Sequence, residues 1–290
     1  MLNPADLHDA VPVVPNGTAV LLLAGSSGRI ESARAELLAT TGARVRAIRW
    51  FGGIDQRPAP HEVPLELFIE QIEVLRRDAD RVVLFGTSFG AEAALAVASR
   101  HHVDGVVAVA PSSVVWAGLH AGSWSSHWTY EGAPVPFVPF DAKWEPDADP
   151  PAFLSLYGSS LQLDTEATKA ARIRVEDITG DVLLIAGGDD RVWPSVRFAA
   201  EIQAARGAAG LQTMVVSHPG AGHRLLLPDE SRASGGITMQ RGGTPDADAE
   251  LGTQAWPHIE RILDSPRRAS SPHPIGWILG HSLRASAPDH

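Results

Sequence analysis

A serine between two glycines, placed between an apolar strand and an alanine-rich helix, limits the folds open to this chain more than any other feature. The strand pattern covers residues 81–85, the pentapeptide Gly86-Thr87-Ser88-Phe89-Gly90 follows at once, and the helical pattern covers residues 91–100. A sharp strand-to-helix turn leaves no space for side chains two residues before and two residues after its central residue. The turn would lift the Ser88 hydroxyl above the sheet, at a helix N-terminus that favours negative charge. We therefore predict that Ser88 is a nucleophile.

Short apolar runs alternate with longer segments rich in Ala, Leu and Glu along the chain. This alternation is typical of a buried parallel sheet flanked by helices. We expect strands at residues 19–23, 45–50, 81–85, 106–110, 181–186 and 212–216. We expect helices at residues 32–41, 64–78, 91–100, 195–206 and 254–264. Together with the pentapeptide, this order predicts the α/β-hydrolase fold, a mostly parallel central sheet with helices on both faces.

The chain of 290 residues fits one large domain, which we expect at residues 1–264. Residues 112–175 interrupt the alternation, and they hold four of the eight tryptophans and many prolines. So long a connection inside a compact domain is usually a functional insertion, so we expect a cap or lid at about 112–175. Residues 265–290 are rich in Ser, Pro, Arg and His, and we expect a loosely ordered tail there.

Composition and charge exclude several classes of function. The formal net charge is −10, so nucleic acid is not an expected partner. The chain has no cysteine, which excludes disulfides, zinc–cysteine sites and a thiol nucleophile. The apolar run at residues 19–24 is too short to span a bilayer, and no export signal is visible. We expect a cytoplasmic enzyme that acts on a small molecule, with no cofactor, no metal and no membrane span.

A serine hydroxyl is a weak nucleophile until a base takes its proton, and an acid must orient that base. In this fold the acid follows the nucleophile in the chain, and the base comes last. Asp189 and Asp190 follow the strand expected at residues 181–186. Asp190, four residues before Pro194, is the preferred acid and Asp189 is the alternative; either could instead cap the next helix.

Two histidines follow the last expected strand, and one of them is the preferred base. His223 lies in a loop of small residues, Pro219-Gly220-Ala221-Gly222, from which it can reach Ser88. His218 lies too close to the end of the strand, so we expect a structural or surface role for it. We expect solvated or core roles for the remaining histidines.

An oxyanion formed at the reacting carbonyl needs two backbone N–H donors. The first would be the amide of Phe89, the residue after the nucleophile. The second would come from the turn after the first expected strand, where Ser26 is preferred and Ser27 is the alternative. Gly25 and Gly28 make this turn tight enough for its amides to face a substrate.

Several further segments form a set that is more specific than the pentapeptide alone. They are Leu22-Leu23-Ala24-Gly25-Ser26-Ser27-Gly28, the pentapeptide with Glu92, Ser112-Ser113-Val114-Val115-Trp116, Gly188-Asp189-Asp190-Arg191-Val192-Trp193-Pro194-Ser195, Pro219-Gly220-Ala221-Gly222-His223, and Gly242-Gly243-Thr244-Pro245 with Ala255-Trp256. Through these segments, residues 18–264 resemble the C-terminal catalytic domain of acyl-CoA thioesterases and of bile acid-CoA:amino acid N-acyltransferase, which are relatives of dienelactone hydrolase.

The resemblance implies a serine hydrolase that cleaves acyl-CoA thioesters to free acid and CoA through an acyl-serine, a reaction of lipid metabolism. It places the family's catalytic triad on Ser88, Asp190 and His223. The acyltransferase branch uses a cysteine nucleophile, so Ser88 points to hydrolysis. Eukaryotic members carry an N-terminal immunoglobulin-like domain, which we do not expect in this chain. Two alternatives stay open: a carboxylesterase or dienelactone-hydrolase-like enzyme acting on small esters, and a non-catalytic binding protein with this fold.

Overall fold

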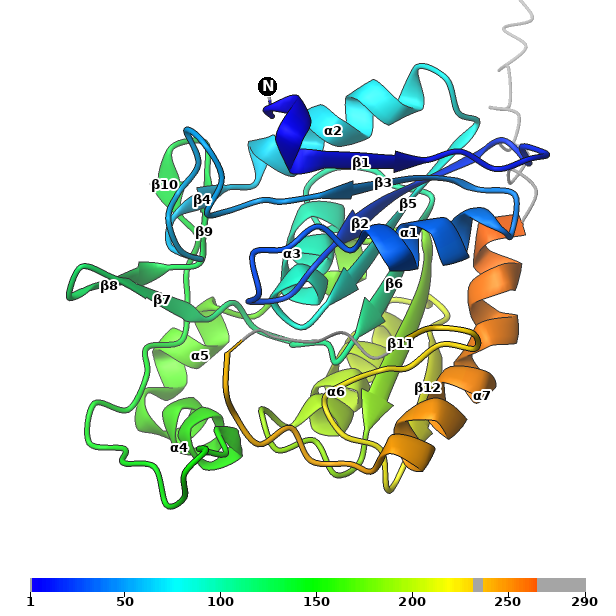
Figure 1. The fold of residues 1–290 in the computed structure, drawn as a ribbon. Helices are drawn as coiled ribbons and strands as arrows, with labels where there is room; N and C mark the ends of the chain where they lie inside the picture. The colour runs from blue at the N-terminus through cyan, green and yellow to red at the C-terminus, as the bar shows by residue number, and fades with distance from the viewer. Residues whose placement is uncertain (1, 232–236, 265–290) are drawn as a thin grey trace, which may run out of the picture.

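A seven-stranded sheet forms the centre of the computed structural model, which describes residues 2–231 and 237–264 (Figure 1). In spatial order its strands are β1 (Leu7–Ala10), β3 (Arg44–Ile48), β2 (Thr18–Leu23), β5 (Arg81–Thr87), β6 (Gly105–Val109), β11 (Asp181–Gly187) and β12 (Met214–His218). Neighbouring strands are parallel except at the edge, where β1 pairs antiparallel with β3. The predicted mostly parallel sheet is therefore confirmed.

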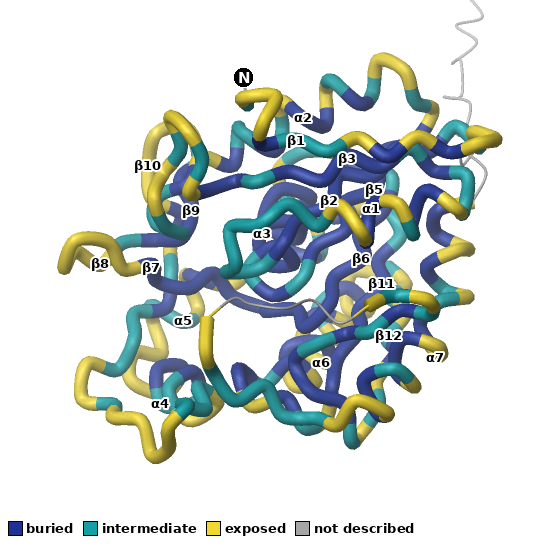
Figure 2. Tube along the Cα trace, viewed as in Figure 1, coloured by how far each residue is buried: buried dark blue, intermediate teal, exposed yellow. Residues whose placement is uncertain are grey.

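Helices cover both faces of this sheet, which explains why its central strands are apolar throughout. One face packs against α2 (Glu66–Arg76), α3 (Phe89–Ala98) and α6 (Ser195–Ala208), and the other against α1 (Ser32–Ala39) and α7 (Pro245–Asp264). Along β2, Leu21 and Leu23 face the first group, while Val20 and Leu22 face the second. Burial on both faces removes the alternation of polar and apolar residues that a half-exposed strand shows. Figure 2 shows the sheet as the buried centre of the molecule.

Several elements differ from those expected. The edge strand β1 is absent from the prediction because its His8 and Asp9 interrupt any apolar run. The last strand covers residues 214–218 rather than 212–216. It lies at the edge of the sheet and only one of its residues is buried, so no apolar run in the sequence indicates where it begins and ends. The closing helix is 245–264 rather than 254–264. Its start is favoured by Pro245 in the first turn and by the Thr244 hydroxyl, which accepts a hydrogen bond from the Ala247 amide (3.2 Å).

Short elements fill the segment where a cap was expected. Figure 1 shows them beside the main sheet rather than within it. They are the hairpin of β7 (Ala117–His120) and β8 (Ser123–Ser126), the strands β9 (Trp128–Tyr130) and β10 (Ala133–Pro134), and the helices α4 (Leu154–Leu163) and α5 (Thr165–Ala170). Strand β9 also pairs with β4 (Val63–Pro64), and two 3-10 turns, η1 (Pro4–Asp6) and η2 (Val175–Asp177), complete the elements.

The boundaries of the domain and of its cap stay predictions. The tail expected at residues 265–290 lies outside the residues that the structure describes. Within residues 2–231 and 237–264, no helix is both long and apolar enough to cross a membrane.

Candidate active site

Ser88 lies on a strained turn between β5 and α3. Its backbone has φ 59° and ψ −120°, a conformation that side-chain-bearing residues rarely adopt. Hydrogen bonds hold the turn: the Ser88 amide donates to the Val109 carbonyl (2.8 Å), and the Ser88 carbonyl accepts from the amides of Ala91 (2.8 Å) and Glu92 (3.0 Å). The surrounding structure therefore compensates for a locally unfavourable backbone.

The two glycines of the pentapeptide allow this turn to pack tightly. A Cβ at Gly86 would overlap the carbonyl of Gly90. A Cβ at Gly90 would overlap the carbonyls of Leu23 and Ala24, at the end of β2. Neither position has space for a larger residue, so the steric reason inferred from the sequence holds here.

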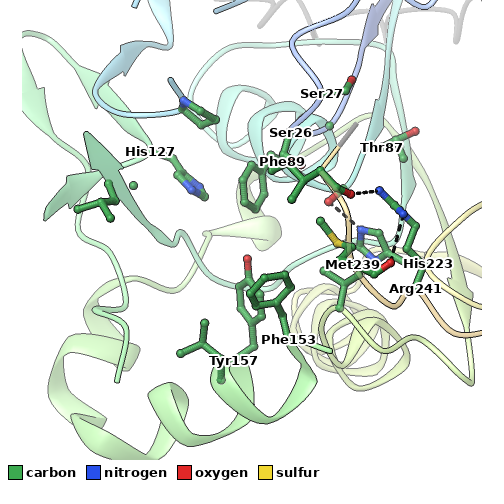
Figure 3. A pocket seen from close by; sticks show the side chains of 18 of the residues that line it. Ser26, Ser27, Thr87, Phe89, His127, Phe153, Tyr157, His223, Met239 and Arg241 are labelled. Carbon is green, nitrogen blue, oxygen red and sulfur yellow. Dashed lines mark hydrogen bonds between the residues drawn. The ribbon is translucent and has the colours of Figure 1, made fainter. Parts of the chain in front are cut away.

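The structure brings Ser88, His223 and Asp190 together in one chain of hydrogen bonds. Nε2 of His223 lies 2.9 Å from Ser88 Oγ, and Nδ1 lies 2.8 Å from Asp190 Oδ2 (Figure 3). All three residues are buried. Asp190 Oδ1 accepts hydrogen bonds from the amides of Val192 (2.8 Å) and Trp193 (3.2 Å), which fix the carboxylate. Because Nδ1–H donates to Asp190, Nε2 is left to accept the proton of the Ser88 hydroxyl.

Asp189 and His218, the other candidates from the sequence, point elsewhere. The Asp189 side chain is 43% exposed, and it accepts hydrogen bonds from the Gly243 amide (2.9 Å) and from Arg191 (3.2 Å). The Gly243 amide is the main reason why the pKa of Asp189 is lowered, with Arg191 adding to it. Nε2 of His218 lies 3.0 Å from a carboxylate oxygen of Glu250. Asp189 and His218 thus hold surface segments in place.

The candidate oxyanion donors lie around Ser88. A Cβ at Gly25 would lie 3.1 Å from the Cβ of Ser88, which shows how closely the turn after β2 approaches the nucleophile candidate. Ser26, Ser27 and Phe89 line the same cavity as Ser88. Among the described residues, the amides of Ser26 and Phe89 donate to no backbone carbonyl. Both are available to a substrate oxygen, and their role stays a prediction.

A cavity of about 490 Å³ opens over the Ser88 hydroxyl. Part of its wall is apolar and is formed by Phe89, Leu119, Trp124, Phe140, Phe153, Leu156, Tyr157, Val192, Ile237 and Met239. Three arginines, Arg29, Arg224 and Arg241, also line it. In Figure 3 Phe153 and Tyr157 lie across the cavity from Arg241, which lies beside His223. Burial lowers the pKa of Arg241, and the charges of Arg224 and Arg29 lower it further.

Several polar residues of the cavity wall were not singled out from the sequence. His127, which lies on this wall, was expected to have a solvated or core role. Tyr157 and the three arginines carried no motif that would have marked them. Their positions depend on loops that fold back over the sheet, and no residue spacing signals this. Within the described part of the chain, no group of three or more His, Asp or Glu side chains is placed to hold a metal ion.

Comparison with known proteins gives a family match and two acyl-coenzyme A thioesterases as relatives. Residues 63–265 match the family described as "BAAT / Acyl-CoA thioester hydrolase C terminal". Mitochondrial acyl-coenzyme A thioesterase 2 of Mus musculus is 26% identical over 257 residues, which cover 84% of this chain and 54% of that protein. Acyl-coenzyme A thioesterase 1 of Mus musculus is 28% identical over 253 residues, covering 85% of this chain and 57% of that protein. The chain thus spans about half the length of these curated relatives.

Solved structures show the same fold at low sequence identity. A putative dienelactone hydrolase from Klebsiella pneumoniae subsp. pneumoniae MGH 78578 has a TM-score of 0.55 and 13% identity, covering 90% of this chain and 92% of that chain. The acylaminoacyl peptidase of Pyrococcus horikoshii has a TM-score of 0.54 and 11% identity, covering 91% of this chain and 40% of that one. These similarities establish the α/β-hydrolase fold. Since the family match covers well over half of the chain, the resemblance seen in the sequence is confirmed, and the chain belongs to the BAAT / acyl-CoA thioester hydrolase C-terminal family.

Proposed function

We propose that this protein hydrolyses acyl-CoA thioesters through an acyl-serine intermediate. The observation that carries the proposal is the buried chain Ser88–His223–Asp190, which opens into a cavity of about 490 Å³. Membership of a family of acyl-CoA thioester hydrolases supports the choice of a thioester as the bond that is cleaved.

In this mechanism Ser88 Oγ attacks the thioester carbonyl while Nε2 of His223 takes its proton. The amides of Phe89 and Ser26 stabilise the oxyanion of the tetrahedral intermediate. The carbon–sulfur bond then breaks, and His223 gives the proton to the departing CoA sulfur. Water next attacks the acyl-serine, His223 takes a proton from it, and cleavage of the ester bond returns that proton to Ser88. Asp190 keeps the imidazole oriented and stabilises its positive charge in both steps.

The arginines on the cavity wall support CoA as the leaving group. CoA carries several phosphate negative charges, and guanidinium groups are well suited to bind phosphates. Arg29, Arg224 and Arg241 line the same cavity as His223, and the charges of the first two act on Arg241. The apolar residues across the cavity from Arg241, among them Phe153 and Tyr157, would then enclose the acyl chain.

We also propose that residues 112–175 form the cap over this cavity. Leu119 and Trp124 of the hairpin β7–β8, Phe140, and the start of α4 with Phe153 and Leu156 all line it. These residues would exclude water from an apolar acyl chain, as the cap of such an enzyme must.

The test is a panel of acyl-CoAs, with the released thiol detected, set beside p-nitrophenyl esters of the same acids. We expect thiol release that depends on Ser88 and a clear preference for the thioester. Activity on the esters with none on any acyl-CoA would refute the thioesterase proposal and leave the carboxylesterase alternative. If a fluorophosphonate probe does not label Ser88 in the folded protein, the nucleophile assignment is wrong.

A further inference from the structure

A second histidine backed by a carboxylate faces the cavity, and the proposed mechanism does not use it. Nδ1 of His127 lies 3.1 Å from Glu92 Oε1. Glu92 is fully buried in the first turn of α3, four residues after Ser88. The same Oε1 accepts hydrogen bonds from the Trp116 amide (3.2 Å) and from the indole Nε1–H of Trp128 (2.8 Å). Glu92 therefore holds His127 as Asp190 holds His223.

These contacts determine which nitrogen of His127 carries its proton. The amide of Trp116 and the indole of Trp128 can only donate, so Glu92 Oε1 acts as an acceptor. Nδ1 of His127 consequently carries the hydrogen, and Nε2 is left with a lone pair. His127 is only 2% exposed, lines the cavity, and packs against the Phe89 ring with a centroid distance of 4.2 Å. Within the described residues, Nε2 takes part in no hydrogen bond.

Tyr157 of α4 brings a hydroxyl to the same cavity. The residue is 6% exposed, and its ring is held edge-on between Trp116 (4.6 Å between centroids) and Trp193 (5.3 Å). Its hydroxyl has no hydrogen-bond partner in the part of the chain that the structure describes. Burial raises the pKa of Tyr157, and the carboxylates of Glu92 and Asp190 raise it further. The phenol stays neutral and can donate a hydrogen bond.

The two groups complement each other, because one is an acceptor and the other a donor. Neither polar atom is among the fully buried atoms that lack a partner in the described residues, so both are accessible from the cavity. In Figure 3 the Tyr157 hydroxyl points toward the part of the cavity that Phe89 and His127 also line. A hydroxyl group of a ligand matches the hydrogen-bonding character of this pair, because it can donate to Nε2 and accept from the phenol. A carbonyl or a carboxylate would place an acceptor against the lone pair of Nε2.

We propose that His127 and Tyr157 form a hydroxyl-binding subsite, so that the preferred acyl group carries a hydroxyl substituent. The Phe89 ring contacts both His127 and Trp193, and Trp193 contacts His223. Ring contacts thus link His127 to His223, and the subsite lies in the same cavity as the triad, where the acyl chain would bind. This inference rests on the proposed function for the acyl group, but it does not depend on CoA as the leaving group.

The test compares acyl groups of one length. Hexanoyl-CoA, its β-hydroxy and ω-hydroxy derivatives, and adipoyl-CoA are assayed for kcat/KM with the full-length protein. We expect at least one hydroxyacyl-CoA to exceed hexanoyl-CoA by about tenfold, the effect of one or two hydrogen bonds to otherwise unpaired groups. Equal values for hydroxyacyl and plain hexanoyl substrates would mean that the pair holds only water, and a preference for adipoyl-CoA would mean a carboxylate site. Either result overturns the proposal.

The variant Tyr157→Phe removes only the hydroxyl. We expect it to lower the ratio of kcat/KM for the preferred hydroxyacyl substrate to kcat/KM for hexanoyl-CoA about tenfold, because only the hydroxyacyl group loses a hydrogen bond. The matched control is Tyr130→Phe, which changes the chain's other tyrosine, outside the cavity. It should alter neither value. A loss that is equal for both substrates would show that Tyr157 has a structural role only, and would contradict the proposal.

Repeating the series with p-nitrophenyl esters separates this proposal from the thioesterase proposal. If no acyl-CoA is cleaved but the esters show the hydroxyl preference, and Tyr157→Phe abolishes it, the subsite stands and the thioesterase function fails. If acyl-CoAs are cleaved without this preference, the thioesterase function stands and the hydroxyl-binding subsite fails. Calorimetric binding of hexanoate and ω-hydroxyhexanoate to the unmodified protein makes the same comparison without turnover, and equal affinities would count against the subsite.

Discussion

The replacement Asp190→Asn tests the mechanism most sharply, because it preserves the shape of the site and changes one hydrogen bond. Oδ1 of the amide can still accept from the amides of Val192 and Trp193, so the loop should keep its path. The group facing Nδ1 of His223 changes from an acceptor to an NH₂ donor, however. His223 must then present a lone pair at Nδ1 and carry its proton on Nε2, which lies 2.9 Å from Ser88 Oγ. It can no longer accept the serine proton.

The expected cost follows from this wrong tautomer. Removing the acid of a Ser-His-Asp triad in this way lowers kcat by about 10⁴-fold, or about 5 kcal/mol of transition-state stabilisation. The measurement is thiol release from saturating acyl-CoA, with thermal unfolding of both proteins as a check that the fold is intact. KM should change far less than kcat, because the cavity wall is untouched.

Asp189→Asn is the matched control, since it makes the same chemical change one residue earlier. The Asp189 side chain is 43% exposed and contacts Arg191 and Gly243 rather than His223, so we expect less than about a threefold loss in kcat. If Asp189→Asn were the more damaging of the two, the assignment of Asp190 as the acid would be refuted. Equal small losses from both variants would refute a triad mechanism.

Three further predictions follow from other contacts. Ser88→Ala should lose at least about a thousandfold in kcat and all labelling by a fluorophosphonate; retained activity would exclude Ser88 as the nucleophile. Arg241→Gln should raise KM about tenfold for acyl-CoA and leave it unchanged for the N-acetylcysteamine thioester of the same acid, which has no phosphates; equal rises would show that Arg241 does not bind CoA. The hydrogen bonds from Arg46 (2.7 Å each) are the main reason why the pKa of Asp9 is lowered in the folded protein. Ionised Asp9 therefore stabilises the fold at any pH above its pKa in the unfolded chain. This stabilisation is lost as the pH falls through the pKa of Asp9 in the folded protein. Asp9→Asn should therefore lower the melting temperature at pH 7, and by progressively less as the pH falls below about 4; a drop that does not change with pH would contradict the linkage.

The residues 18–23, 81–98 and 181–187 show which parts of the fold could be predicted from the sequence. Each contains a pattern that is visible in consecutive residues: the apolar run of a strand buried on both faces, or the alanine-rich composition of a helix. The requirement for Gly86 and Gly90 is equally local, since it comes from the close approach of the strand and helix on either side of Ser88. The order of nucleophile, acid and base also lies in the sequence alone.

The strand β1 was missed for a physical reason. It has four residues, of which only Ala10 is buried, and it is held by its ladder with β3 and by the pair of Asp9 with Arg46. Both contacts join residues that are distant in sequence. Neither leaves a periodic pattern that a reading of residues 7–10 could detect.

The sequence by itself determined the fold class, the nucleophile candidate and the short list for its partners, because these depend on local periodicity and on steric limits within a few residues. Only the tertiary structure shows that Asp190 contacts His223 and that Asp189 contacts Gly243, since adjacent residues differ in the direction their side chains take from one loop. It alone joined Glu92 to His127 across 35 residues, and placed Tyr157 on the same wall. Such contacts depend on how the cap segment folds back over the sheet, and the free energy that holds them comes from packing between elements rather than from any local pattern.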